Sequence, residues 1–408
     1  MQNCDFRRIA NEVLHWAVLR GFKGTDPYDG LNSRLLAPLL KNSRFLRLAT
    51  IQTVKRSPIN LRPLLGVPEG YNPKGLALFL SGLGLTKEED KTGNANLITW
   101  LEQMILSLAS RPDGSPVFSE DRRIRMDITS AEAEQAGVLA WGYNFPWQSR
   151  AFLQPAWYPT VVCSSFVLDA LRDSQSVFYP IVARKLAQFT IDSLNVHKDE
   201  SGICFSYSPR DNTRVYNASL FAAKILVQAA QFEEEPRKAR LRKLAREACS
   251  YVAAKQRANG SWVYGEADHW QWVDNLHTGF VLETMQFITE ALETDEFKES
   301  LLKGLGYYRS SLFTENGDAK YFENSLYPLD PHGYAQGAIT MKKLNEPDFA
   351  ERILSRAVEQ LWDESKKGFF RKLSKHSREG LIHLRWNQGW MYKALKERQR
   401  QGNDEDLV

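Results

Sequence analysis

The stretch Gln256–Glu283, QRANGSWVYGEADHWQWVDNLHTGFVLE, decides the fold because it contains one complete structural unit. The Asn-Gly pair at 259–260 tolerates positive φ angles and predicts a tight turn. An aromatic strand or extended run follows at Ser261–Tyr264, and then comes a loop rich in ionisable side chains. A helix is expected to begin at Asn275 or Thr278. A polar loop held between an aromatic run and a helix N-terminus is where a functional site is expected.

The same plan recurs with different loops at a period of roughly 50 to 60 residues, which indicates a repeat architecture. Each unit is a helix, a turn of glycine and aromatic residues, a polar loop and a second helix. About six or seven such helical hairpins can be read along the chain, and each must stack on its neighbours to bury its apolar face. Closing six of them gives an all-α (α/α)₆ toroid or barrel with short aromatic β-hairpin turns on one rim. The polar loops that precede the inner helices would gather on that rim, and an open solenoid is the alternative.

Apolar residues at helical spacing predict most of the individual elements. The predicted helices cover residues 6–19, 31–40, 44–54, 72–83, 94–109, 160–171, 177–194, 216–230, 236–255, 297–313, 349–361 and 382–395. Further helices end at Ala291 and Lys343, and a short apolar strand is predicted between Gly137 and Gly142. We expect one domain over residues 1–398 and a polar tail over 399–408.

Composition excludes several classes of protein. The 408 residues are 43% hydrophobic and carry a formal net charge of only +4, so no nucleic-acid footprint appears. The four cysteines lie far apart, which argues against a zinc site or a disulfide framework, and no cofactor is expected. The N-terminus lacks the apolar core of a secretory signal, and no stretch is apolar enough for a membrane span. We therefore expect a soluble, cytoplasmic protein.

Candidate catalytic residues lie in the loops that precede two of the expected inner helices. Asp274 and His277 are three residues apart and share a helix face, so Asp274 could orient His277, act as an acid or base, or simply cap the helix. Asp268 together with Asp274 would supply the carboxylate pair that glycoside hydrolysis needs. His332 takes the equivalent place in the next unit, and Tyr334 lies nearby; such a pair suits proton abstraction in elimination or epimerisation. A solvated loop and a packed histidine are the structural alternatives.

Candidate substrate-binding residues are aromatic, basic or amide side chains on the same rim. Tryptophans stack on sugar faces, and arginine binds a carboxylate or phosphate through two parallel hydrogen bonds. Packing beneath the loops and surface ion pairs are the alternative roles. The candidates are Tyr28, Trp147, Arg210, Trp270, Trp272, Asp330, Arg385 and Gln388.

Gln256, Gly260 and Trp262 are spaced as in the Gln-Trp repeat motif, and this segment resembles terpenoid cyclases and protein prenyltransferases. Degenerate copies stand at 200–205 and 315–320. The resemblance implies an α/α-toroid fold. It does not imply the chemistry of those families, because the acidic Asp-x-Asp-Asp motif of the cyclases is absent and the zinc ligands of the prenyltransferases have no match.

A second resemblance covers most of the chain. The blocks Asp26–Ser33, Asp274–Gly279 and Arg385–Trp390 resemble those of α/α-toroid proteins encoded in bacterial polysaccharide-biosynthesis clusters. The chain is also distantly similar to the helical barrels of polysaccharide lyases, unsaturated-sugar hydrolases and sugar epimerases. The resemblance implies a glycan or glycolipid precursor as the partner, and it raises contact with other proteins of the pathway as a further expectation.

Together these observations predict a carbohydrate-active enzyme of exopolysaccharide or capsule biosynthesis. It would act on an anionic or oligomeric glycan by acid/base chemistry, as hydrolysis, elimination or epimerisation. One alternative is a terpenoid-cyclase-like or isoprenoid-binding toroid, which predicts an apolar aromatic cavity with few charges. The other is a non-catalytic glycan-binding or scaffold protein, which predicts an open aromatic groove.

Overall fold

The inner wall of the molecule is a closed ring of helices, seen in a computed structural model that describes residues 5–57, 59–86, 93–149 and 152–398. The six inner helices of this described part are α4 (Pro73–Gly84), α8 (Val161–Asp173), α10 (Tyr216–Ala230), α12 (Asn275–Leu292), α14 (Pro331–Lys343) and α16 (Trp390–Glu397). Each contacts the next, and α16 contacts α4, so the ring closes. The predicted (α/α)₆ toroid is confirmed, and the open solenoid is excluded.

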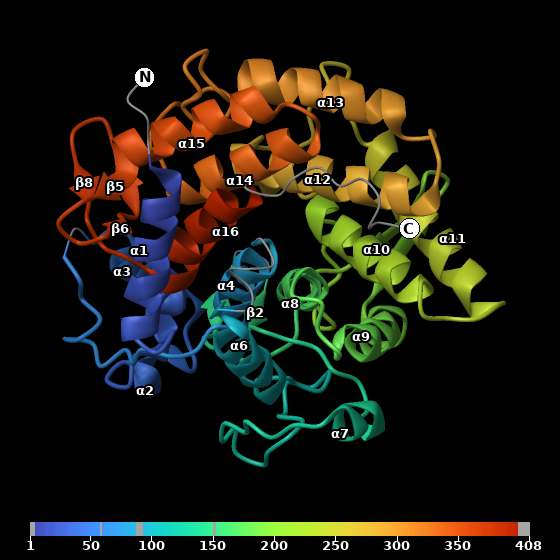
Figure 1. Cartoon of the computed structure of the whole chain (residues 1–408), viewed down its shortest axis with the longest axis horizontal. Coiled ribbons are helices and arrows are strands. Elements are labelled where there is room, and N and C mark those ends of the chain that lie inside the picture. Colours follow the sequence, from blue (N-terminus) through green and yellow to red (C-terminus); the bar gives the residue numbers. More distant parts are fainter. Residues whose placement is uncertain (1–4, 58, 87–92, 150–151, 399–408) are drawn as a thin grey trace.

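A second layer of helices surrounds this ring. The outer helices are α1 (Phe6–Leu19), α6 (Ala95–Ser107), α9 (Tyr179–Ser193), α11 (Arg237–Ala254), α13 (Lys298–Ser311) and α15 (Pro347–Leu361). They are amphipathic: α15, for example, buries Phe349, Ile353 and Leu361 at helical spacing and exposes the opposite face. In Figure 1 the first helix, α1 in blue, lies beside the last, α16 in red, which joins the two ends of the chain.

Short helices and strand pairs connect the long helices of the two layers. The helical ones are η1 (Asp29–Asn32), α2 (Ala37–Leu40), α3 (Arg44–Arg56), α7 (Ser130–Gln135), η2 (Asp268–Trp270) and the π-helical turn η3 (Leu384–Gly389). The antiparallel strand pairs are β1 (Trp147–Gln148) with β2 (Leu153–Gln154), β3 (Val196–Asp199) with β4 (Gly202–Phe205), β5 (Trp362–Asp363) with β6 (Gly368–Phe369) and β7 (Lys372–Leu373) with β8 (Arg378–Glu379). They confirm the predicted short hairpins.

Three predicted elements differ from the structure. The strand expected between Gly137 and Gly142 is wrong, because only Ala140 pairs there, in an isolated bridge with Ser110. The helix expected over 31–40 is divided into η1 and α2, since the Ser33 backbone is extended. The helix expected over 382–395 begins only at Leu384, as the π turn η3. The tail predicted over 399–408 lies outside the described residues.

The barrel axis is filled by two layers of side chains. Phe166, Phe221, Phe280 and Trp390, from four inner helices, pack with ring centroids 5.2–5.8 Å apart. The second layer is charged. Its side chains lie three residues further along each of those helices and are Asp169, Lys224, Glu283 and Lys393. Three residues are nearly one helical turn, so the charged layer lies directly behind the aromatic one. The central cavity expected from a toroid is therefore closed below the rim.

Among the described helices, none combines the length and the apolar character that crossing a bilayer requires.

Gly84 allows the C-terminal end of α4 to touch the end of α8, and its replacement by alanine tests that contact. A Cβ atom at Gly84 would stand 2.3 Å from the carbonyl oxygen of Asp173, so one backbone must move. We expect Gly84→Ala to lower the free energy of unfolding by about 1–3 kcal/mol in urea denaturation.

Gly306 provides the matched control, because it lies within the outer helix α13 and a Cβ there meets nothing within 4 Å. Gly306→Ala should raise the free energy of unfolding by about 0.5–1 kcal/mol, through helix propensity alone. Equal effects of the two substitutions would contradict the close approach of α4 and α8.

Candidate active site

A cavity of about 210 Å³ opens on the rim where α12 and α14 begin. The turn between α13 and α14, Trp386 of η3 and Tyr28 from the loop before η1 complete it. Its walls carry both aromatic and ionisable side chains, and the residues that line it include Tyr28, Trp272, Asp274, His277, Lys320, Tyr321, Phe322, Asp330, His332 and Trp386. The polar loops that precede these inner helices thus gather on one rim, as the repeat pattern predicts.

The first acid/base group of the cavity is the pair Asp274 and His277. Asp274 is the N-cap of α12, and its Oδ1 accepts a hydrogen bond of 2.8 Å from the backbone N–H of His277. Its Oδ2 lies 2.7 Å from Nδ1 of the His277 ring and also accepts a bond of 2.9 Å from Nε1 of Trp272. Asp274 therefore caps the helix and orients the imidazole at once, so the two interpretations of this residue are compatible.

The protonation of this pair follows from its surroundings. Burial alone would raise the pKa of Asp274, but the His277 ring and the hydrogen bonds from His277 and Trp272 bring that pKa below its usual value. An ionised carboxylate has no proton to donate, so the proton in the short contact belongs to Nδ1 of His277. When the ring carries only this proton, Nε2 has a free lone pair, and no residue of the described chain is bonded to it. This arrangement fits a general base.

The next unit repeats the arrangement with Asp330, His332 and Trp386. Asp330 is the N-cap of α14 and accepts a bond of 2.9 Å from the backbone N–H of His332. Nε1 of Trp386 lies 3.0 Å from both carboxylate oxygens of Asp330. Two successive inner helices thus share the same features at their N-termini. Each is capped by an aspartate that accepts a hydrogen bond from a tryptophan indole, and each carries a histidine in its first turn that lines the same cavity.

The second histidine differs from the first in having no partner for its ring. His332 is 3% exposed, and neither of its ring nitrogens has a hydrogen-bond partner among the described residues. Burial, reinforced by the charges of Lys74 and Arg385, holds the pKa of His332 well below its usual value, so the ring is neutral. Buried polar atoms are normally paired, and an unpaired imidazole at a cavity wall indicates a ligand that supplies the missing hydrogen bonds.

Asp330 allows a test of the electrostatics. Burial raises the pKa of Asp330 above its usual value, although the bonds from His332 and Trp386 oppose the shift. A carboxyl whose pKa is raised in the folded state contributes stability below its unfolded pKa and loses that contribution as the pH rises through its folded pKa. We therefore expect the free energy of unfolding of the wild type to fall, relative to that of Asp330→Asn, as the pH rises from the unfolded to the folded pKa of Asp330. Urea denaturation at several pH values between pH 4 and 8 measures this difference. A difference independent of pH would contradict the raised pKa.

The aromatic layer of the barrel axis packs against the two histidines that line the cavity. The ring of His332 lies 4.2 Å from that of Trp390, and Phe280 lies one helical turn beyond His277 on α12. Lys74 is buried beside this layer, with Nζ 3.9 Å from the centroid of Phe166. Burial, with the nearby charge of Arg385, lowers the pKa of Lys74 well below its usual value. Packed side chains of the barrel axis therefore lie behind the cavity, which opens on the rim.

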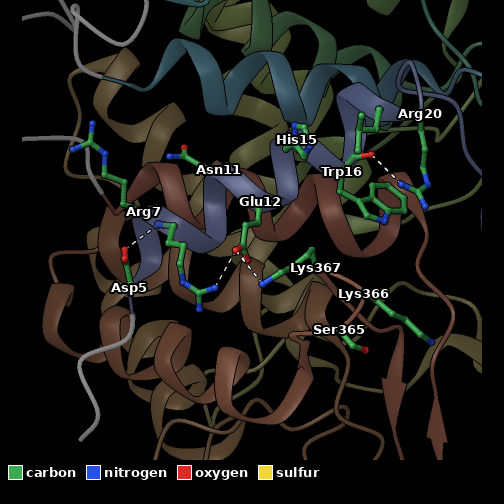
Figure 2. A pocket seen from close by; sticks show the side chains of 12 residues that line it. Asp5, Arg7, Asn11, Glu12, His15, Trp16, Arg20, Ser365, Lys366 and Lys367 are labelled. Carbon is green, nitrogen blue, oxygen red and sulfur yellow. Dashed lines mark hydrogen bonds and ion pairs between the residues drawn. The ribbon is translucent and has the colours of Figure 1, made fainter.

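A larger hollow, of about 730 Å³, lies on the outer side of α1 (Figure 2). Its charged side chains are engaged with one another: Glu12 pairs with both Arg8 and Lys367, and Arg20 lies over the ring of Trp16. It opens toward the surface, and although Oε2 of Glu12 is buried without a hydrogen-bond partner, the same carboxylate is already paired with Arg8 and Lys367 through Oε1. The smaller cavity on the rim is therefore the candidate site.

The structure brings six of the sequence candidates to that cavity. These are Tyr28, Trp272, Asp274, His277, Asp330 and His332. Tyr28 stands against Trp386, with the ring centroids 5.4 Å apart, and Lys55 donates a bond of 2.7 Å to its hydroxyl. Trp272 stacks on Tyr264. The aromatic and the ionisable candidates therefore share one wall.

Seven other candidates do not line the cavity. Asp268 and Arg210 are exposed on their loops, and Arg210 lies over Tyr158. Trp270 and Trp147 pack on Tyr264 and Tyr207 respectively. Tyr334 is fully buried and donates to Asp318, Arg385 is buried and paired with Asp26 at 2.6 Å, and Gln388 bonds to the Phe369 backbone.

Trp386, Tyr321 and Phe322 line the cavity although they are absent from the candidates. Trp386 lies within the Arg385–Trp390 block, and the other two are the aromatic pair of the turn before Asp330, so the repeat itself could have indicated them. Lys74 has no such signal, because it is one lysine in the first turn of an ordinary helix.

No family model and no curated protein matches this chain. Several solved structures match it in fold. Cellobiose 2-epimerase from Bacillus thermoamylovorans is 10% identical, with a TM-score of 0.55 over 82% of this chain and 90% of that chain. The GH76 α-mannanase of Bacteroides thetaiotaomicron is 8% identical, with a TM-score of 0.56 over 98% and 96%. An unsaturated glucuronyl hydrolase from a Bacillus species is 11% identical, with a TM-score of 0.51 over 83% and 89%.

At such low identity these matches establish the fold alone. They agree with the distant similarity to sugar epimerases and unsaturated-sugar hydrolases that the sequence indicates, and each match covers more than four fifths of this chain. The chemistry must be inferred from the residues of the cavity itself.

Proposed function

We propose that this protein is a carbohydrate-active enzyme that performs acid/base chemistry on a glycan in the rim cavity. The observation that carries the proposal is the repeated arrangement of Asp274 with His277 and Asp330 with His332, at the starts of adjacent inner helices, around one cavity. The solved structures of similar fold include an epimerase and hydrolases of sugars, which supports a glycan as the ligand.

The free groups in the cavity favour proton transfer at carbon over hydrolysis. Both carboxylates already accept indole and backbone N–H groups, whereas Nε2 of His277 and both ring nitrogens of His332 have no partner in the described chain. One imidazole would remove the proton next to a sugar carbonyl or carboxylate and leave an enolate. Return of a proton to the opposite face completes epimerisation, and loss of the substituent at the β carbon completes elimination.

The surroundings of the cavity support an anionic or oligomeric glycan. Trp272, Trp386 and Phe322 offer ring faces for stacking on sugars. The positive charges of Lys55 and Arg371 act on Asp330, and those of Lys74 and Arg385 act on His332. The basic side chains that act on Asp330 and His332 favour a substrate that carries a carboxylate. A place in the biosynthesis of a bacterial polysaccharide is supported by the sequence blocks alone.

The experiment is a panel of neutral and uronate-containing oligosaccharides, incubated in D₂O with the wild-type protein. Mass spectrometry follows the uptake of deuterium and the addition of water, and absorbance near 235 nm follows an unsaturated uronate. Deuterium uptake without cleavage is the expected sign of epimerisation, and cleavage with absorbance is the sign of elimination. Cleavage with addition of water would show hydrolysis and would contradict the preference for proton transfer at carbon.

The two other readings make distinct predictions for the same panel. An isoprenoid-binding toroid requires a deep apolar cavity, and the aromatic and ionic layers that close the axis argue against it. A non-catalytic glycan-binding protein would bind at least one member of the panel and leave all of them unchanged. That result would contradict the proposed enzymatic function and would favour a glycan-binding protein.

A further inference from the structure

Residues 30–57 and 59–68, which we call the basic lobe, carry positive charge only. This segment contains no aspartate or glutamate, and its basic residues are Arg34, Lys41, Arg44, Arg47, Lys55, Arg56 and Arg62. The whole chain has a net charge of only +4, so the concentration of like charge in one segment is a local feature. Arg34, Lys41, Arg44 and Arg56 are exposed.

The basic lobe also exposes large apolar side chains. Among the described residues of the entire chain, eight large apolar side chains are more than 60% exposed, and five of them belong to this lobe. The five are Leu35 (67%), Leu39 (61%), Phe45 (77%), Ile59 (66%) and Leu64 (73%). A concentration of exposed apolar side chains marks an interaction surface.

These side chains belong to one small folded body. Leu31, Leu40 and Ile51 form a separate hydrophobic cluster at its centre. Leu39 lies in α2 and Leu35 lies in the turn just before it, and the backbone of Gly66 lies against Arg34 and Leu35. The guanidinium of Arg47 bonds to the carbonyls of Leu40 and Lys41 and so holds the start of α3 against the end of α2. Exposed apolar and basic groups therefore belong to one folded segment.

We infer that the basic lobe attaches the protein to the surface of an anionic lipid bilayer. Exposed leucine and phenylalanine side chains would enter the boundary between headgroups and acyl chains, while lysine and arginine would pair with the anionic headgroups. The mixture of the two kinds of side chain, with no acidic residue among them, fits this surface. The inference does not depend on the proposed enzymatic function.

Charge argues against a second copy of the chain as the occupant. In a symmetric dimer the same surface meets itself, so the basic residues of one lobe would face basic residues of the other, with no acidic residue of the lobe between them. Burying like charges opposite one another is unfavourable, whereas an anionic bilayer neutralises them. The positive charge of the basic lobe therefore favours an anionic lipid surface over a second copy of the chain as the binding partner.

The basic lobe is connected to the candidate active site. Lys55 donates to the hydroxyl of Tyr28, which lines the cavity, and Arg62 forms a buried pair of 2.7 Å with Asp29 of the same loop. Attachment through the lobe would therefore bring the cavity close to the bilayer surface.

Flotation of the full-length protein with lipid vesicles tests the inference. The probes are vesicles of phosphatidylcholine alone and vesicles in which about a third of the lipid is phosphatidylglycerol. We expect the bound fraction to be at least about fivefold higher on the anionic vesicles and to fall as salt is raised, because salt screens exposed charges. Absence of binding to either vesicle, or equal binding to both, would overturn the inference.

Two double variants locate the binding surface. Leu39→Ser with Phe45→Ser removes apolar contacts, and Arg34→Glu with Lys41→Glu reverses charge; each should lower the bound fraction at least about fivefold. The matched control is Val177→Ser with Leu302→Ser, at positions 71% and 63% exposed elsewhere on the chain, and its binding should equal that of wild type. Circular dichroism and thermal melting verify that each variant is folded.

Sedimentation velocity distinguishes binding to lipid from self-association of the chain. A wild-type dimer in solution that the Leu39 and Phe45 variant converts to monomer would show that the surface binds a second copy, and would overturn attachment to lipid. Unchanged vesicle binding by both lobe variants, with both folded, would overturn it as well.

Discussion

Replacement of Asp274 by asparagine is expected to reduce kcat by about 10²–10⁴-fold on the glycan that the wild-type protein converts. The amide nitrogen of asparagine can donate to Nδ1 of His277, which moves the ring proton to Nε2 and removes the free lone pair. Asparagine is also a good N-cap, so the start of α12 should keep its structure and the variant should fold. Steady-state kinetics on the converted glycan measures the loss.

Asp268→Asn is the matched control for this experiment. Asp268 is exposed in η2, six residues before Asp274, and does not line the cavity. Its replacement should leave kcat within about twofold of wild type, as is usual for surface substitutions. If Asp274→Asn also keeps kcat within about threefold, His277 does not act through the carboxylate of Asp274.

The second large effect is expected on stability, in the ionic layer of the barrel axis. Nζ of Lys224 lies 2.7 Å from Oδ2 of Asp169, and the two side chains are 2% and 4% exposed. Asp169→Asn removes the carboxylate that is hydrogen-bonded to the buried ammonium group of Lys224 and leaves Glu283 as the other acidic group that acts on it. We expect the free energy of unfolding to fall by about 3–5 kcal/mol in urea denaturation.

A double variant separates the lost pair from a simple packing defect. Asp169→Asn with Lys224→Met removes the unpaired charge as well, and it should recover much of the stability that the single variant loses. Asp192→Asn, at an exposed position on the outer helix α9, should change the free energy of unfolding by less than about 0.5 kcal/mol. No recovery in the double variant would contradict an electrostatic origin of the loss.

Helical periodicity was sufficient to predict the toroid because several inner helices, such as α4 and α10, carry long apolar runs. The predicted helix over 216–230 has the same bounds as α10, in which every residue is buried. Asp274 and His277 could be paired from sequence because residues three apart share a helix face. The Asp and His of the next unit then followed from the repeat.

Tyr334 shows the limit of the same reasoning. It lies two residues after His332, which is roughly 200° around the helix axis, so the two side chains point to opposite sides of α14. His332 faces the cavity, whereas Tyr334 donates to Asp318 beneath the loop. Proximity in the sequence was not a guide to proximity in the cavity.

The filling of the barrel axis by side chains also could not be predicted from local sequence patterns. It depends on Phe166, Phe221, Phe280 and Trp390, which come from four helices separated by more than fifty residues each, and no local pattern relates them. Only the closed ring brings these side chains to one level. The resulting shallow cavity is what distinguishes the proposed glycan site from a deep apolar one.

Protection of His277 from chemical modification tests the location of the glycan site most directly. The protein is treated with diethyl pyrocarbonate, with and without the glycan that it converts, or with each panel member at millimolar concentration if none is converted. Mass spectrometry then reports modification at each histidine. We predict that glycan protects His277, which lines the cavity, and leaves the exposed His269 as reactive as before. Equal modification of His277 with and without a bound or converted glycan would contradict the placement of the site in this cavity.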